Sequence, residues 1–530
     1  GADASKPGEV KEVKIDFAGF ERRAIALPVG PGNFGRLATT DGGQLVYARS
    51  GGIKIFDPKA DSRSEKSVTD GAGGFDISAD GKKLLAFRGG SMSVMDASAG
   101  GGKSTSVPTS GMLVTINPRL EWVQIFMDTW RLQRDFFYEP TMHGVDWAAL
   151  RVHYLAMIED CASREDVAFV QGELISELNI GHAYITSPGD VESSPQIGVG
   201  VLGCDYELVK SDAGTAYKIT KIYAGADWDT DARGPLSQLG VDVKEGDYLL
   251  AVDGVPVDTS KDVWAAFIDT ANRTTSITVS DKPVMDASAR EVLVKPIGGE
   301  AGLRYRSWIE QNRAYVEKRS EGKGGYIYVP NTGVDGQNDL FRQFIGQRGK
   351  EALIIDDRWN GGGQIPTRFI ELLNRPVTNY WAKRDGQDWT WPPDSHQGPK
   401  AMLINGLAGS GGDMFPWLFK HNKLGKVFGT RTWGGLVGIS GNPGLIDGGG
   451  ISVPTFGFYK TDGNWGVEGH GVDPDVEVID GPSKLSAGVD PQLDAVTDHL
   501  LNEIKTNGYT PPKRPASPDR RGMGIPPEQR

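Results

Sequence analysis

The chain has 530 residues, of which 38% are hydrophobic and 24% charged, and its formal net charge is −12. This length predicts three or four domains of ordinary globular composition. The acidic balance argues against electrostatic binding to nucleic acid, and no apolar run approaches the ~18 residues that a membrane helix requires. The beginning, GADASKPGEV, does not read as a signal peptide, which leaves a cytoplasmic or a periplasmic location open.

Residues 1–116 contain a repeat. Asp41-Gly42 recurs as Asp80-Gly81, and Asp57 recurs as Asp96. The offset is about 40 residues, and each unit alternates strand-like segments with glycine turns, which is typical of a β-propeller blade. About two units are present, whereas a closed propeller needs at least ~4 blades. We therefore expect partial β-propeller blades, with a small two-repeat β-sandwich as the alternative.

Residues 117–190 read as a small helical domain. Large apolar side chains recur at helical spacing between Pro118 and Pro140. Two further amphipathic helices are expected over residues 146–161 and 163–178, the second with a capping serine followed three residues later by an aspartate. The domain ends in a turn and a short strand-like segment that begins at His182, one of only seven histidines.

Residues 191–299 are β-rich and resemble a PDZ domain. The pattern GD-x-(I/L)-x-x-(V/I)-(D/N)-G of such domains is matched from Gly246 to Gly254, and a helix is expected over residues 261–269. PDZ domains bind chain ends by adding a strand to a sheet edge. An uninvolved spacer with this fold is the alternative.

Residues 300–505 alternate apolar strands with helices, which is typical of an α/β layer with ligand sites beyond the strand ends. The expected strands lie within residues 322–331, 350–359, 399–408 and 425–432, and the expected helices within residues 338–346, 366–374 and 412–425. Residues 506–530 are rich in proline and arginine, and we expect an extended tail that is ordered only where it docks.

Ser410 lies between glycines where a strand runs into a helix. Its surroundings, AGSGG, are a relaxed form of the G-x-S-x-G turn that presents a nucleophilic serine. The small neighbours allow a sharp bend, and the N-terminus of the helix places free N–H groups beside the hydroxyl oxygen. On this stretch alone, a plain glycine-rich loop is the alternative.

Three further features bear on the chemistry. The turn Gly361–Gly363 follows another strand and exposes amides that suit an oxyanion hole, or less well a phosphate cradle, because no Gly-Lys-Ser/Thr follows. Glu468 precedes a Gly-Val-Asp-Pro turn, where a carboxylate could orient a histidine. The histidines have no His-Glu-x-x-His spacing, and Cys161 and Cys204 are the only cysteines, so we expect no metal site and no cofactor.

The order of these motifs resembles the tricorn-type branch of the C-terminal processing (tail-specific) serine protease family, over nearly the whole chain. Propeller repeats precede the core in that branch, and a PDZ domain lies within it. The family's motifs are (S/G)-H-A-Y, D-x-R-x-N-G-G-G, A-G-S-x-G-D-x-F and E-x-x-G-V-x-P-D, matched here at residues 181–184, 356–363, 408–415 and 468–475.

The resemblance implies a multidomain α+β fold: partial β-propeller repeats, a small helical domain, a PDZ domain and an α/β (ClpP/crotonase-like) catalytic domain. It also implies a serine peptidase that cleaves short or unfolded peptides through an acyl-enzyme at Ser410, with His182 as general base. Glu468 would stabilise the imidazolium, and the amides of Gly411 and Gly362 would form the oxyanion hole. Peptides or unfolded proteins are the expected partners, and a homo-oligomer, up to a hexamer, is the expected assembly.

Several alternatives stay open. The branch keeps a serine where this chain has Gly181, so Glu468 would have to reach His182 directly, through water, or through Tyr184 or Ser440. Other members of the wider family use a lysine as the base, which here would be Lys420 or Lys423. A peptide-binding scaffold with impaired catalysis is therefore the alternative function. Tyr380 and Trp381 lie where the primary specificity pocket is sought, so a preference for basic residues does not carry over.

Overall fold

The computed structural model describes residues 16–62, 64–187, 194–226, 232–521, 524 and 526–529. The chain divides into two compact units, residues 1–116 and residues 117–530. In the described part of the chain, no helix is both long enough and apolar enough to cross a membrane.

The first unit consists of two antiparallel sheets of four strands each, in the orders β1-β2-β3-β4 and β5-β6-β7-β8. The strands are β1 (Phe34–Thr39), β2 (Leu45–Arg49), β3 (Gly52–Phe56), β4 (Lys66–Asp70), β5 (Gly74–Ile77), β6 (Lys83–Arg88), β7 (Ser91–Asp96) and β8 (Thr105–Ser106). The two repeated Asp-Gly turns pack together, since a Cβ at Gly81 would lie 2.3 Å from the Asp41 nitrogen. Ile53 and Leu84 belong to one core that both sheets share. These propeller-like sheets agree with the predicted blades.

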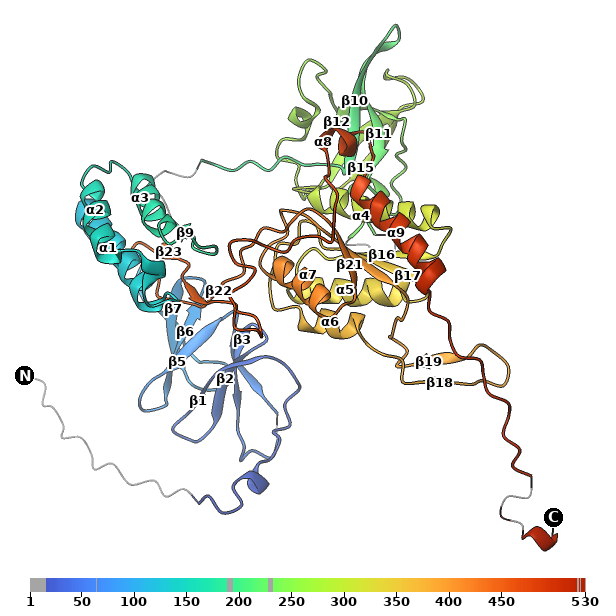
Figure 1. Ribbon diagram of the computed structural model, residues 1–530. Helices are drawn as coiled ribbons and strands as arrows, with labels where there is room; N and C mark the ends of the chain where they lie inside the picture. The colour runs from blue at the N-terminus through green and yellow to red at the C-terminus, as the bar shows by residue number, and fades with distance from the viewer. Residues whose placement is uncertain are drawn as a thin grey trace, which may run out of the picture. The chain divides into compact units, whose positions relative to one another are not determined.

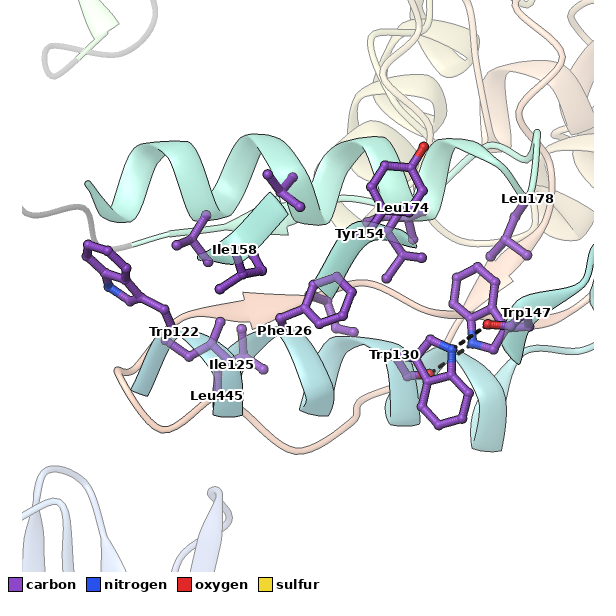
Figure 2. Close-up of a cluster of buried hydrophobic side chains, with 14 of the residues drawn as sticks. Trp122, Ile125, Phe126, Trp130, Trp147, Tyr154, Ile158, Leu174, Leu178 and Leu445 are labelled. Carbon is purple, nitrogen blue, oxygen red and sulfur yellow. Dashed lines mark hydrogen bonds between the residues drawn. The ribbon is translucent and has the colours of Figure 1, made fainter. Parts of the chain in front are cut away.

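The second unit begins with three helices, α1 (Pro118–Phe136), α2 (Trp147–Ile158) and α3 (Arg164–Ser176). Each helix is capped at its start by a side chain that accepts a main-chain N–H of the first turn. The capping residues are Asn117, Asp146 and Ser163 respectively. Figure 2 shows the aromatic core between them, where Trp130 Nε1 donates to the Trp147 carbonyl at 2.7 Å and Trp147 Nε1 donates to the Trp130 carbonyl at 3.1 Å. The apolar periodicity of these helices therefore buries one shared core.

A distant segment completes this helical core. Leu445, Ile451 and Val453 pack into it, and Leu445 is visible beside Ile125 in Figure 2. Strand β9 (Ile185–Thr186) pairs with β23 (Gly450–Ile451), and the buried Arg164 Nε donates to Asp447 Oδ2 at 2.6 Å. The strand that follows His182 is therefore fixed to a loop of the α/β part.

The PDZ-like part is a sheet of six strands in the order β10-β11-β12-β14-β15, with β13 paired to β12. Its strands are β10 (Cys204–Ser211), β11 (Gly214–Ile222), β12 (Tyr248–Val252), β13 (Val255–Pro256), β14 (Thr275–Ser280) and β15 (Arg290–Val294). The helix expected over residues 261–269 is only the 3₁₀ helix η5 (Val263–Phe267). It stops because the Phe267 carbonyl accepts the Gly200 N–H at 2.9 Å and the Asp269 N–H donates to the Gly198 carbonyl at 2.8 Å.

The α/β part has a parallel sheet of five strands in the order β16-β17-β20-β21-β25. These are β16 (Gly324–Tyr328), β17 (Ala352–Asp356), β20 (Lys400–Ile404), β21 (Gly425–Gly429) and β25 (Val476–Glu477). On one face they pack against α4 (Ala301–Arg319) and α9 (Pro491–Asn507), and on the other against α5 (Val334–Gln347), α6 (Thr367–Leu373) and α7 (Gly411–His421) (Figure 1). Since β17 and β20 are neighbours and parallel, the loops that follow them meet at one sheet edge.

A hairpin of β18 (Asn379–Trp381) and β19 (Trp389–Trp391) stands apart from this sheet (Figure 1). The chain after α9 runs along it without regular structure: Arg514 Nε donates to Asp388 Oδ2 at 3.0 Å, and the Tyr509 and Tyr380 hydroxyls are hydrogen-bonded. The expected tail is thus extended and docks on the hairpin. The remaining short elements are η1 (Glu21–Arg23), η2 (Met142–Gly144), η4 (Pro235–Ser237), β22 (Gly438–Ile439), β24 (Pro454–Phe456), α8 (Pro482–Ser486) and η6 (Pro527–Gln529).

Candidate active site

Ser410 occupies a strained turn between β20 and α7. Its backbone angles, φ 59° and ψ −114°, lie in a region that residues with side chains rarely adopt. The Ser410 N–H donates to Asp413 Oδ2 at 2.8 Å, which holds the turn at the start of the helix. Strain of this kind is characteristic of a nucleophilic serine presented between a strand and a helix.

The triple-glycine turn lies directly against Ser410. A Cβ at Gly362 would be 2.7 Å from the Ser410 Cβ, and a Cβ at Gly411 would be 1.9 Å from Thr332 Oγ1. Only glycine fits at these two positions, because a side chain would collide with Ser410 at the first and with Thr332 at the second. The structure therefore brings together the two glycine-rich loops that were identified separately in the sequence.

The two amides expected to form the oxyanion hole differ in their present partners. Gly411 is the first residue of α7, a position whose N–H has no acceptor within the helix. The Gly362 N–H, by contrast, donates to Asn360 Oδ1 at 2.9 Å, and Asn360 Nδ2 in turn donates to Asp357 Oδ1 at 2.7 Å. Burial raises the pKa of the Asp357 carboxyl well above its usual range. Gly362 is thus engaged within its own loop.

His182 is half-buried and lies beside Trp433, with 5.7 Å between the ring centroids. Trp433 contacts the serine turn. Its main-chain N–H donates to the Ala408 carbonyl at 2.9 Å, and a Cβ at Gly409 would be 2.6 Å from its ring. His182 Nδ1 is buried and finds no hydrogen-bond partner among the described residues.

The environment of His182 favours the neutral imidazole. Burial lowers the pKa of His182, while the negative charges of Glu468 and Asp413 act in the opposite direction and raise it. The net direction is downward, so the ring is unprotonated at neutral pH. A neutral ring is the form that a general base requires.

Glu468 accepts hydrogen bonds from the main chain beside His182. Its Oε1 accepts the Gly181 N–H at 2.9 Å, and its Oε2 accepts the N–H groups of Leu436 and Val437, the latter at 2.8 Å. Within the described residues, none of the hydrogen bonds of Glu468 goes to the His182 ring. Of the hydroxyls considered as relays, Ser440 is hydrogen-bonded to Thr455 at 2.8 Å. Glu468 therefore bonds to the main chain next to His182, and its negative charge raises the pKa of the His182 ring, without a hydrogen bond to that ring.

Asp413 was part of a motif, but its role was missed in the sequence. Its Oδ2 accepts the N–H groups of Ser410 and Gly435, and its Oδ1 accepts the Thr432 hydroxyl and the Gly434 N–H. The next two residues of the same loop, Leu436 and Val437, donate their N–H groups to Glu468. The spacing Ser-x-x-Asp, which is the spacing of a helix-capping pair, was the signal that could have indicated it.

The three parts of the second unit match known family models. Residues 118–176 match the Tricorn protease C1 domain, residues 200–299 the Tricorn protease PDZ domain, and residues 323–478 the peptidase family S41. The chain belongs to the tricorn protease family. The resemblance inferred from the order of motifs is thereby confirmed.

Tricorn-family relatives of this chain are longer. It is 33% identical over 525 residues to Tricorn protease homolog 1 of Streptomyces coelicolor, over 95% of this chain and 48% of that protein. It is 33% identical over 396 residues to the Tricorn protease of Thermoplasma acidophilum, over 75% of this chain and 36% of that one. A crystal structure of the tricorn protease matches with a TM-score of 0.78 and 30% identity, over 87% of this chain and 44% of that chain. The chain spans about half the length of these relatives, or less.

In this tricorn-family chain, the two lysines considered as a base lie at the wrong end of α7. Ser410 precedes the helix, whereas Lys420 is in its last turn and Lys423 lies beyond it. A helix of 11 residues is about 15 Å long. Lys420 Nζ is also paired with Asp475 Oδ1 at 2.8 Å. The geometry therefore disfavours a serine–lysine pair.

The residues expected at the specificity pocket and His470 make their hydrogen bonds elsewhere than at the serine turn. Tyr380 and Trp381 lie in the β18–β19 hairpin, where Tyr380 contacts the C-terminal tail. His470, two residues after Glu468, has its Nε2 2.7 Å from Asp473 Oδ2 on the surface. No cluster of three or more His, Cys, Asp or Glu side chains suited to a metal ion occurs among the described residues.

Proposed function

We propose that this chain is a serine peptidase that hydrolyses peptide bonds of short or unfolded peptides through an acyl-enzyme at Ser410. The observation that carries the proposal is the strained Ser410 turn, which is packed against the triple-glycine loop and faces a helix N-terminus. Membership of the tricorn protease family supports the same reaction.

In the first step, His182 takes the proton of the Ser410 hydroxyl while the serine oxygen attacks the peptide carbonyl. The tetrahedral intermediate then collapses. Its C–N bond breaks, His182 gives the proton to the leaving amine, and an ester to Ser410 remains. In the second step, His182 takes a proton from water while the hydroxide attacks the ester carbon. The second tetrahedral intermediate collapses, its C–O bond to Ser410 breaks, and His182 gives its proton to the serine oxygen as the acid product leaves.

The oxyanion of each tetrahedral intermediate would be stabilised by main-chain amides. The Gly411 N–H is suited to this role, because it begins α7 and carries the positive end of the helix dipole. The Gly362 N–H now donates to Asn360 Oδ1 at 2.9 Å. It can donate to the oxyanion as a second donor only when that hydrogen bond is broken. We therefore assign Gly411 as the permanent donor and Gly362 as a donor that becomes free on substrate binding.

Glu468 would support His182 at a distance. Its negative charge stabilises the imidazolium that forms in each step, and its bond to the Gly181 N–H fixes the backbone of the neighbouring residue. The position that carries a relay serine in the resembling proteases is Gly181, which has no side chain to take part. The proposed site thus relies on the negative charge of Glu468 and on its hydrogen bond to the Gly181 main chain.

A peptide-binding scaffold with impaired catalysis is the second candidate. The observation that favours it is that Glu468 makes no hydrogen bond to the His182 ring within the described residues. In that case the PDZ-like and α/β parts would hold peptides without cleaving them.

A fluorophosphonate probe separates the two functions. Such a probe forms a covalent bond only with an activated serine. We expect the intact chain to be labelled at Ser410, Ser410→Ala to remain unlabelled, and His182→Ala to fold normally but to label slowly and lose peptide cleavage. An unlabelled intact chain that still binds peptides would establish the scaffold instead.

We further propose that the protein acts as a homo-oligomer, up to a hexamer, on the basis of its family. Light scattering coupled to size-exclusion chromatography would measure the assembly directly. A monomer at micromolar concentration would contradict this part of the proposal.

A further inference from the structure

An apolar groove lies beside His182. Its volume is about 600 Å³, and we call it the α3 groove. One wall is α3, through Phe169, Gly172 and Ile175. The other wall is the segment around His182, through Ile180, Ala183 and Tyr184. A groove of this size and composition is suited to an apolar ligand group.

The wall from α3 is a second apolar face of that helix. Val167, Val170 and Leu174 face the core, whereas Phe169 and Gly172 follow helical spacing on the groove side. Phe169 leaves 68% of its surface exposed. Ile175 belongs to both the core and the groove wall, whereas Phe169 and Gly172 belong to the groove wall alone.

Gly172 is the most informative residue of the groove. It lies in the interior of α3, where glycine is a poor helix former. A Cβ added there would meet nothing within 4 Å, so packing inside the chain does not require a glycine. The missing side chain leaves room in the middle of the groove wall.

The groove adjoins the proposed catalytic base. Tyr184 forms part of its wall, and its ring centroid is 5.9 Å from that of His182. Ile180 and Ala183 lie on either side of His182 in the sequence. In serine peptidase chemistry the histidine protonates the leaving amine, so the substrate residues after the scissile bond lie on the side of the histidine.

We propose that the α3 groove binds an apolar side chain of the peptide on the leaving-group side of the scissile bond. The inference rests on the proposed peptidase function and deepens it, because it assigns a subsite and the chemistry of its ligand. Aliphatic or aromatic side chains fit the groove, since its lining side chains are apolar apart from the hydroxyls of Ser176, Tyr184 and Ser187.

Partitioning of the acyl-enzyme tests this subsite directly. An ester substrate forms the acyl-enzyme, which then reacts either with water or with an added amino-acid amide. The amino group of the amino-acid amide attacks the ester carbon and forms a new C–N bond, while His182 takes a proton from the amine and gives it to the leaving Ser410 oxygen, in the reverse of leaving-group departure. Amides that occupy the leaving-group subsite should therefore react faster. For the wild-type chain we expect leucinamide to give about tenfold more product than glycinamide, the usual effect of a filled apolar pocket.

Two leucine substitutions give a matched pair. Gly172→Leu fills the groove from its wall and should reduce the leucinamide preference to below about twofold, which is the loss expected once the pocket is occupied. Gly346→Leu in α5 is the control, because Gly346 is also a helical glycine with nothing within 4 Å of its Cβ, and it should keep the wild-type preference. Gly172→Ala adds only a methyl group and should keep most of the preference. Thermal unfolding confirms that each variant is folded.

The outcomes distinguish this inference from the function beneath it. Equal reaction of leucinamide and glycinamide in the wild type, or an unchanged preference in Gly172→Leu, overturns the subsite while ester turnover that depends on Ser410 leaves the peptidase intact. If no acyl-enzyme forms, or if Ser410→Ala turns over the ester as well as the wild type, the peptidase function and the subsite both fail.

Discussion

Replacing Glu468 with glutamine should lower activity and, at the same time, extend it to more acidic pH. Glutamine keeps the size of the side chain but has one acceptor oxygen and no charge. The Glu468 carboxylate accepts three main-chain N–H groups, from Gly181 at Oε1 and from Leu436 and Val437 at Oε2. The substitution therefore affects both the position of the backbone before His182 and the charge near its ring.

The size of the loss follows from these bonds. The best orientation of glutamine places its oxygen toward Leu436 and Val437 and its NH₂ group toward the Gly181 N–H, which then loses its acceptor. One hydrogen bond to a charged group contributes about 1.5–3 kcal/mol. If the whole loss is felt in the transition state, kcat/KM falls by about 10- to 150-fold.

The pH profile shifts in the opposite sense. The charge of Glu468 raises the pKa of His182 against the larger lowering effect of burial. Without that charge the pKa of His182 falls further, so the imidazole stays neutral and active to a lower pH. The acid limb of kcat/KM against pH should therefore move to lower pH in Glu468→Gln while the plateau drops. A steady-state profile between pH 4 and 8, on a chromogenic peptide, measures both.

Asp473→Asn is the control, because it removes a charge from the same loop at a carboxylate that pairs with His470 on the surface. It should leave the plateau and the acid limb unchanged. An unshifted acid limb in Glu468→Gln would show that Glu468 has no electrostatic effect on the base, and an unchanged plateau would show that its grip on Gly181 does not matter. Either result would refute the role proposed for it.

Substitutions at three further positions, with a control at a fourth, test the remaining contacts. Asp413→Asn converts one of two acceptor oxygens into a donor that faces main-chain N–H groups. It should destabilise the chain by about 3 kcal/mol and slow fluorophosphonate labelling of Ser410 more than about tenfold. Labelling at the wild-type rate would contradict the link between Asp413 and Ser410. Gly181→Ser and Gly181→Ala both place a Cβ 3.0 Å from Glu468 Oε1. Only the serine can donate to the carboxylate, so kcat/KM of the serine variant should exceed that of the alanine variant by about tenfold. Equal values would exclude a relay at this position. Asp447→Asn weakens the buried pair with Arg164 and should lower stability by about 3 kcal/mol in thermal unfolding, whereas Asp462→Asn, at an exposed surface pair, should change it little.

The elements that could be predicted from the sequence are those fixed by local patterns. The three helices of the helical domain and the parallel strands follow from apolar spacing, capping side chains and glycine turns that lie within a few residues of each other. The helix expected over residues 261–269 fails for the opposite reason, since its end is decided by main-chain bonds from Gly198 and Gly200, more than sixty residues earlier in the chain.

The candidate site shows the same division. Ser410 and the triple-glycine turn could be predicted, because each lies where a strand ends and its loop is rich in glycine. That the Gly362 amide is held by Asn360 could not be predicted, because it depends on the folded shape of one loop. The position of His182 also depends on distant residues, since the strand after it pairs with β23 and the core beneath it includes Leu445.

The two halves of the site are joined by one loop, residues 432–437, which two carboxylates hold at opposite ends. Asp413 binds its beginning and the Ser410 N–H, whereas Glu468 binds its end and the Gly181 N–H beside His182. Every one of these contacts except that of the Thr432 hydroxyl uses a main-chain N–H. Such a frame holds the proposed nucleophile and the proposed base without any side chain at residue 181. A glycine can therefore occupy that position while the backbone before His182 keeps its hydrogen bond to Glu468.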